Sequence, residues 1–162
     1  MPIPLEMGIH RHAHAAIVVL LATCLLAGCV TRMSEQELGT SLAAIKPIPG
    51  RQAVRRVVPI YADTPMAAWA LGEEAKNDPE SSPLSLELAA GFALGRIRQV
   101  DYIVGGPYPK LSDRVVVNGL TMNEGRVMPG LRIVLVSPDA PTPDLLRAAK
   151  AKRVRLEHRP LR

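Results

Sequence analysis

The stretch LRIVLV, residues 131–136, is short, apolar and rich in branched side chains. Such a run is typical of a strand that is buried on both faces of a parallel sheet. Thr142 and Pro143 then mark a helix start, as N-cap and first-turn proline, and open a helix over residues 145–152. The alternating segment at residues 154–158 predicts a further strand, at a sheet edge. These three elements form a β-α-β unit whose strands we expect to run parallel through a right-handed crossover.

Two more strands are predicted upstream of this unit. The segment VRRVVPIY, residues 54–61, predicts the first of them. Pro59 places that strand at an edge, because proline has no N–H to give to the hydrogen-bond ladder. Residues 101–106 predict the second strand, which ends in the turn Gly105-Gly106.

The segments between the strands carry helix start signals, in which a capping side chain precedes a proline or an acidic residue. We expect Trp69, on the first of these helices, to be a packing residue. The expected helices are residues 66–76 after Thr64-Pro65, residues 84–99 after Ser82-Pro83, and residues 114–124 between Ser112-Asp113 and Gly125.

The resulting element order is β-α-α-β-α-β-α-β. The chain has 162 residues, of which 48% are hydrophobic and 22% charged, as is normal for one globular domain. Strands that alternate with helices of about ten residues favour a mainly parallel sheet. The sequence therefore predicts a small three-layer α/β domain, Rossmann-like or flavodoxin-like, over residues 53–162.

The N-terminal segment has the pattern of a secretory signal peptide. Residues 15–28 read AAIVVLLATCLLAG and carry no charge. This run is shorter than the roughly 20 residues that a membrane-spanning helix needs, and its length fits the apolar region of a signal peptide. Arg11 supplies a positive charge before it, whereas Glu6 is unusual in such a region. We therefore expect Met7, which would leave out Glu6, to be the better start.

The apolar run ends in Leu26-Ala27-Gly28-Cys29, which resembles the lipobox of bacterial lipoproteins. The resemblance covers residues 7–29. It implies cleavage before Cys29, whose thiol accepts a diacylglyceryl group, and acylation that leaves two or three chains. One acyl chain binds a membrane only reversibly, whereas two or three hold a protein there stably. An uncleaved anchor, or cleavage by the ordinary signal peptidase, is the alternative.

The lipoprotein resemblance also suggests an address. In Gram-negative lipoproteins an Asp after the acylated cysteine tends to retain the protein in the inner membrane, and here that residue is Val30. The expected location is therefore the periplasmic face of the outer membrane, with the inner membrane as the alternative. Cys24 would be lost with the leader, so Cys29 would be the only cysteine of the mature chain and no intrachain disulfide would form.

The chain is thus expected to have three parts. Residues 1–28 are the lipoprotein signal peptide, residues 29–52 are the lipidated N-terminus with a tether, and residues 53–162 are the domain. Within the tether, Ser34 as N-cap and Glu37 three residues later predict a short helix over residues 34–45.

The formal charge of +5 is concentrated in part at the C-terminus. Six basic residues there stand against Glu157 alone: Lys150, Lys152, Arg153, Arg155, Arg159 and Arg162. A solvated helix end with an edge strand protected by charge is one interpretation, and contact with an anionic membrane surface is the other. No nucleic acid is expected as a partner, because no nucleic-acid-binding motif accompanies the charge.

A ligand cleft is conceivable beyond the carboxyl ends of the predicted strands, where open parallel sheets bind ligands. Asp63, Gly105-Gly106 with Tyr108, and Ser137 with Asp139 fall in those loops. The helix starts nearby offer free N–H groups to an anion. Capping and ordinary turn composition explain the same residues without any ligand.

The sequence carries no catalytic or metal-binding constellation that we recognise. It has no G-x-S-x-G, G-x-G-x-x-G or P-loop motif. His158 is the only histidine of the mature chain and has no evident acid partner, and one histidine with one lipid-committed cysteine does not make a common zinc set. No cofactor is expected.

The leading expectation is therefore an envelope lipoprotein, leaning towards a non-enzyme, whose small domain binds a protein partner or supports an envelope assembly. One alternative is a small enzyme or phosphate-ligand binder that uses the loops at Asp63, Gly105-Gly106 and Asp139. Another is an accessory lipoprotein of a secretion machine.

Overall fold

The computed structural model describes residues 33–161, and Ser34–Arg162 form one compact unit. The predicted signal peptide, the lipobox-like motif and Cys29 lie outside the described residues. None of the described helices combines the length and the apolar character that crossing a membrane requires.

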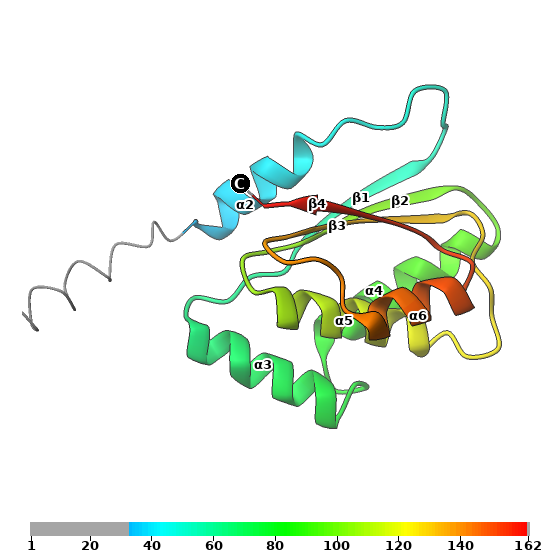
Figure 1. Ribbon diagram of the computed structural model, residues 1–162. Coiled ribbons are helices and arrows are strands. Elements are labelled where there is room, and N and C mark those ends of the chain that lie inside the picture. The colour runs from blue at the N-terminus through cyan, green and yellow to red at the C-terminus, as the bar shows by residue number, and fades with distance from the viewer. Residues whose placement is uncertain (1–32, 162) are drawn as a thin grey trace, which may run out of the picture. The chain divides into compact units, whose positions relative to one another are not determined.

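Four parallel strands form one sheet in the order β1-β2-β3-β4 (Figure 1). The strands are β1 (Val54–Pro59), β2 (Val100–Gly105), β3 (Leu131–Ser137) and β4 (Arg155–Pro160). All residues of β2 and β3 are buried, as predicted for the apolar run at residues 131–136. The two edge positions fall to β1, which contains Pro59, and to β4, which alternates apolar and polar side chains, so both edge predictions are confirmed.

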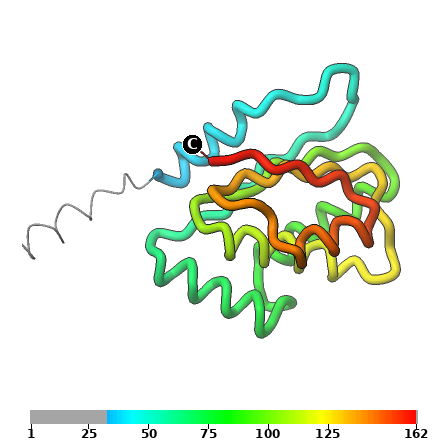
Figure 2. The backbone as a smooth tube through the Cα atoms, in the orientation of Figure 1, coloured from blue at the N-terminus to red at the C-terminus, as the bar shows by residue number. Residues whose placement is uncertain are grey.

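The predicted order of helices and strands is confirmed. After α2 (Glu35–Ala43) the chain runs β1, α3 (Pro65–Asn77), α4 (Pro83–Phe92), β2, α5 (Pro109–Thr121), β3, α6 (Pro143–Ala151) and β4. A 3₁₀ turn, η1 (Ala93–Arg96), continues α4. In Figures 1 and 2, α3, α4, α5 and α6 lie on one side of the sheet and α2 on the other. The result is a three-layer α/β domain.

The main hydrophobic core lies between the sheet and helices α4 to α6. Alternate residues of β2 and β3 point into it, including Tyr102 and Ile133. The ring of Tyr102 meets that of Phe92 edge to face, with 4.9 Å between centroids. Gly91 permits this contact, because a Cβ there would lie 1.7 Å from the Tyr102 hydroxyl. Gly91 thus allows α4 to approach β2 closely.

A second, smaller cluster lies on the opposite face of the sheet. Ile103, Val134 and Val136 are buried on this face, and α2 brings Leu38 and Leu42, both fully buried, to it. Ser34 caps α2, accepting from the Glu37 N–H at 3.2 Å while Glu37 accepts from the Ser34 N–H at 2.7 Å.

The packed unit therefore begins at Ser34, earlier than the boundary at residue 53 expected from the sequence. The reason is burial: α2 packs against β1 and β2, and without it apolar residues on this face such as Ile103 would be open to water. The predicted short helix forms, but it belongs to the domain and is not part of a tether.

Two further details differ from expectation. Helix α5 begins at Pro109, so Ser112 and Asp113 are buried inside its second turn and do not cap it. Proline is favoured at the first position of a helix, where its missing N–H is not needed. The long helix expected over residues 84–99 ends at Phe92 and gives way to the 3₁₀ turn.

Candidate binding groove

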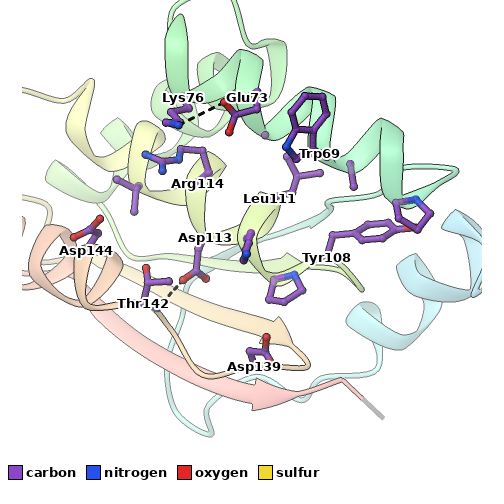
Figure 3. Close-up of a pocket in the computed structure, with 16 residues that line it drawn as sticks. Trp69, Glu73, Lys76, Tyr108, Leu111, Asp113, Arg114, Asp139, Thr142 and Asp144 are labelled. Atoms are coloured by element: carbon purple, nitrogen blue, oxygen red, sulfur yellow. Dashed lines mark hydrogen bonds and ion pairs between the residues drawn. The ribbon is translucent and has the colours of Figure 1, made fainter.

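A hollow of about 620 Å³ opens between α3, the first half of α5 and the loop that joins β3 to α6 (Figure 3). Its apolar lining includes Ala68, Trp69, Leu111 and Val117. Charged side chains of both signs line it as well, including Glu73, Lys76, Lys110, Arg114, Asp139 and Asp144. We call this hollow the α3–α5 groove.

The N-terminal end of α3 is fixed by local sequence. Thr64 has extended backbone and its hydroxyl accepts from the Ala67 N–H at 3.1 Å, while Pro65 occupies the first turn. The helix buries only its small residues, Ala68 and Ala75. Because small residues face the core, α3 lies close to α5 and its larger side chains are left at the rim of the groove.

Trp69 is the largest of these rim residues, and its expected packing role is wrong. Its side chain is 64% exposed, one residue after the buried Ala68. Tyr108, half-buried, lies at the same groove just before α5. Two aromatic side chains thus border the groove in a chain whose aromatic content is 3%.

Asp113 holds the opposite wall in place. Its Oδ2 accepts from the backbone N–H of Thr142 at 2.6 Å, which ties the loop after β3 to α5. Thr142 in turn caps α6, accepting from the Leu145 N–H at 3.4 Å. Asp113 is only 5% exposed, and its Oδ1 has no hydrogen-bond partner among residues 33–161. A buried carboxylate oxygen without a partner favours a hydrogen-bond donor or a cation close to it.

The charges at the rim are partly paired. Lys76 lies 3.5 Å from Glu73, and Arg147 pairs with Asp144 outside the groove. Both pairs are exposed and contribute little to stability. Because they are exposed, these charged side chains remain available to a ligand in the groove.

Of the six residues expected to form a cleft, the structure brings Tyr108 and Asp139 to the groove. Asp63 is exposed and is not among the lining residues, and its neighbour Thr64 caps α3 without its help. The helix start expected there is correct.

The glycine pair has a structural explanation. Gly105 has a φ of +147°, and a Cβ on it would lie 1.9 Å from the Val136 carbonyl oxygen. A Cβ on Gly106 would lie 1.9 Å from the Ile60 carbonyl oxygen. Both residues are buried between neighbouring backbones, so they let β1, β2 and β3 end side by side and do not form an open phosphate loop.

Ser137 is completely buried at the end of β3, and its hydroxyl has no partner among the described residues. Its carbonyl oxygen lies 3.0 Å from His158 Nε2. Neither residue lines the groove. In the described part of the chain, no cluster of three or more His, Cys, Asp or Glu side chains is arranged to hold a metal ion.

Sequence reasoning missed Trp69, Asp113 and most of the charged rim. Asp113 was not predicted as a groove residue, because the start of α5 was placed too late and Asp113 was interpreted as part of the helix cap. Ala68 and Ala75, seven residues apart and therefore on one face of a helix, were the available signal, because they form the face of α3 that packs on the core.

Comparison of the chain with protein-family models, with curated proteins and with solved structures found no match. The interpretation of the groove therefore depends on its geometry. The groove lining contains no histidine, serine or cysteine. Its combination of apolar floor and charged rim suits non-covalent binding.

Proposed function

We propose that the protein is a lipid-anchored lipoprotein of the bacterial cell envelope whose α/β domain binds a protein partner through the α3–α5 groove. The exposed Trp69 at the rim of this groove is the observation that carries the binding part of the proposal. The anchoring part rests on the lipobox Leu26-Ala27-Gly28-Cys29. Val30 after the acylated cysteine favours the periplasmic face of the outer membrane.

The anchoring part has a direct test. Replacing Cys29 by Ser removes the thiol that accepts the diacylglyceryl group, so the chain should lose its acyl label and accumulate as unprocessed precursor. Cell fractionation with radiolabelled palmitate checks both outcomes. A Cys29→Ser chain that still loses its leader and still sediments with membranes would rule out lipid anchoring. Cys24→Ser, within the same apolar run, is the matched control and should process normally.

The binding part follows from the side chains at the groove. Trp and Tyr are enriched where a few residues carry most of the energy of a protein interface. Leaving Trp69 in water has a cost, since burial of a large apolar side chain is worth about 2 kcal/mol. An occupant that covers Trp69 recovers that free energy, and the surrounding charges fix its orientation.

The dimensions and chemistry of the groove fit a short segment of another protein. Its volume of about 620 Å³ accommodates a few side chains. The open end lies between two helices, where an apolar anchor residue reaches Trp69 while polar atoms of the segment meet Lys110 and Asp139.

The test is capture from detergent-solubilised membranes with the acylated full chain as bait. We expect Trp69→Ala to reduce co-purification of one defined assembly at least about tenfold, as for a residue that dominates an interface. Ile97→Ala is the matched control, because Ile97 is the more exposed side chain, at 81%, and does not line the groove. It should leave recovery unchanged.

Thermal unfolding separates loss of binding from loss of fold. Trp69 is mostly exposed, so the alanine variant should unfold within a few degrees of the parent. Equal recovery of the assembly with Trp69→Ala and with the parent would contradict the proposal. Recovery of the bait alone in every case would contradict it as well.

A further inference from the structure

A second hollow, of about 740 Å³, lies on the face of the sheet that carries α2. One wall is the end of α2, with Ser41, and the segment that follows it, with Lys46. The floor and the other wall come from β3 and β4, through Arg132, Arg155, Glu157 and Arg159. We call it the basic hollow. Figure 1 shows α2 on one side of the sheet and α3 and α5 on the other, so the basic hollow and the α3–α5 groove are on opposite faces.

The basic hollow has a strong excess of positive charge. Lys46, Arg132, Arg155 and Arg159 face a single acid, Glu157. That acid is already engaged, since its oxygens accept from Arg132 at 2.7 and 2.9 Å and lie 2.9 Å from Arg155 Nε. The α3–α5 groove, in contrast, carries three basic and four acidic side chains (Lys76, Lys110 and Arg114 against Glu73, Asp113, Asp139 and Asp144).

Arg132 gives the hollow a fixed cation. It is only 2% exposed, and it donates to Glu157 and, at 3.1 Å, to Asp101. Asp101 is held from its other side by Arg51 at 2.9 Å. Three of the five guanidinium N–H groups are used in these bonds, so the group is oriented before any ligand arrives.

The exposed cations stand around this fixed one. Lys46, Arg155 and Arg159 are all exposed, and Arg155 and Arg159 lie on the same face of β4 as Glu157. Arg155 is only partly available to a ligand, because its Nε is directed to Glu157. Arginines in this arrangement suit phosphate groups, because the planar guanidinium can donate two parallel hydrogen bonds to two phosphate oxygens.

The segment between the proposed anchor, Cys29, and the domain is short, which keeps the basic hollow near a bilayer. Residues 30–33 alone separate Cys29 from Ser34, so Ser34 lies at most roughly 18 Å from the acylated cysteine. Ser41, at the wall of the hollow, is roughly 11 Å further along α2. The hollow therefore lies within about one domain diameter of the membrane surface.

We propose that the basic hollow binds the phosphate groups of anionic membrane lipids. This inference rests on the proposed lipid anchoring, which places the domain at a bilayer. Lipid contact on the α2 face leaves the α3–α5 groove, on the other face of the sheet, directed away from the bilayer and open to a partner. It also explains the basic C-terminal strand by one of the two interpretations that the sequence left open.

The test uses the mature-length chain, residues 29–162, with Cys29→Ser, so that no acyl chain contributes. This chain keeps the whole compact unit Ser34–Arg162 with both hydrophobic clusters. Sedimentation with phosphatidylglycerol–phosphatidylcholine vesicles is compared with pure phosphatidylcholine vesicles in 0.1 M salt, where the Debye length is about 10 Å. We expect binding to the anionic vesicles only, and its loss at 1 M salt.

A double charge reversal, Lys46→Glu with Arg159→Glu, should lower the affinity for anionic vesicles by about 30-fold or more, since each basic residue near such a surface contributes about fivefold. Arg126→Glu with Lys150→Glu is the matched control: it makes the same change in net charge on exposed residues that do not line the hollow. The control should change affinity less than about threefold at this salt concentration.

Three outcomes would overturn the proposal. They are equal binding to neutral vesicles, equal loss of affinity in both double variants, and titration of the hollow by inorganic phosphate without any binding to vesicles. All four substituted residues are exposed, so thermal unfolding should be nearly unchanged, and Lys46→Ala with Arg159→Ala repeats the test with a milder change. Because the chain carries no lipid in this assay, its result is separate from that of the acylation test on Cys29.

Discussion

Arg132 is a charged residue within a fully buried strand. Within the apolar run at residues 131–136 it is the only charge, and it occupies the centre of the sheet with its side chain 2% exposed. It is tolerated there because Asp101 and Glu157 lie on the neighbouring strands and accept its hydrogen bonds. In register, Arg55, Asp101, Arg132 and Arg155 form a row across the four strands. Asp101 and Arg132 are the buried members, and removing either leaves an uncompensated buried charge.

The ion pair between Glu157 and Arg132 gives the stability of the fold a pH dependence. Hydrogen bonds from Arg132, more than any other cause, lower the pKa of Glu157 below its ordinary value of 4.5. A carboxyl with a lowered folded-state pKa stabilises the fold above its ordinary pKa, and the contribution is lost as the pH falls through the folded-state pKa. We therefore expect the free energy of unfolding to fall between pH 5 and pH 3, measured by urea denaturation, and Glu157→Gln to reduce that slope.

Glu124→Gln is the control for this prediction, because Glu124 is exposed and forms no ion pair in the described structure. It should keep the slope of the parent chain. If Glu157→Gln also kept the parent's slope, the pairing with Arg132 would not contribute to stability in this pH range.

The sequence predicted only some of the residues that line the α3–α5 groove. Tyr108 and Asp139 were found because they follow predicted strands, and carboxyl ends of parallel strands meet at one edge. Gly105, Gly106 and Ser137 follow the same rule, yet they are buried between backbones or under the sheet edge. Position along the chain places a residue at an edge, but it does not say whether its side chain reaches an open surface.

Among the elements, α2 departs most from expectation. Its start was predicted correctly from Ser34 and Glu37, because capping is a local property of a few residues. Its packing was not, since a nine-residue helix near a predicted lipid anchor reads equally well as part of a tether. The deciding fact is non-local: β2 and β3 have apolar residues on both faces, so the second face needs a cover.

Leu42→Ala tests whether α2 belongs to the domain. Leu42 is fully buried, so truncation should lower the free energy of unfolding by about 2–5 kcal/mol in urea denaturation. Leu146→Ala, on the exposed side of α6, should change it by less than about 1 kcal/mol. An unchanged stability in Leu42→Ala would mean that α2 is part of a tether after all.

On the scale of the whole molecule, the strand order follows the chain order, β1-β2-β3-β4. When each strand is added on the same side of the last with crossovers of one hand, all the connecting helices come to lie on one face. This is the arrangement of α3 to α6 in Figure 1. The order never reverses, so the sheet has no switch point at which a crevice would open between diverging loops. The groove is instead formed between helices and the β3–α6 loop.

This topology also gives the domain two different faces. The helical face carries the α3–α5 groove, with balanced charge and an exposed tryptophan. The α2 face carries the basic hollow, because one short helix covers β1 and β2 while leaving room beside β4. A partner and a membrane can therefore be engaged at the same time under the two proposals.

The sequence by itself determined the class of fold and the order of its elements, because hydrophobic periodicity, N-caps and first-turn prolines act over a few residues. It also supplies the lipobox, which lies outside the described residues and stays a prediction. The tertiary structure alone decided that the domain begins at Ser34, that Trp69 is exposed, and that Asp113 holds a groove wall. These features depend on which face of each element finds a neighbour, and that neighbour comes from distant parts of the chain.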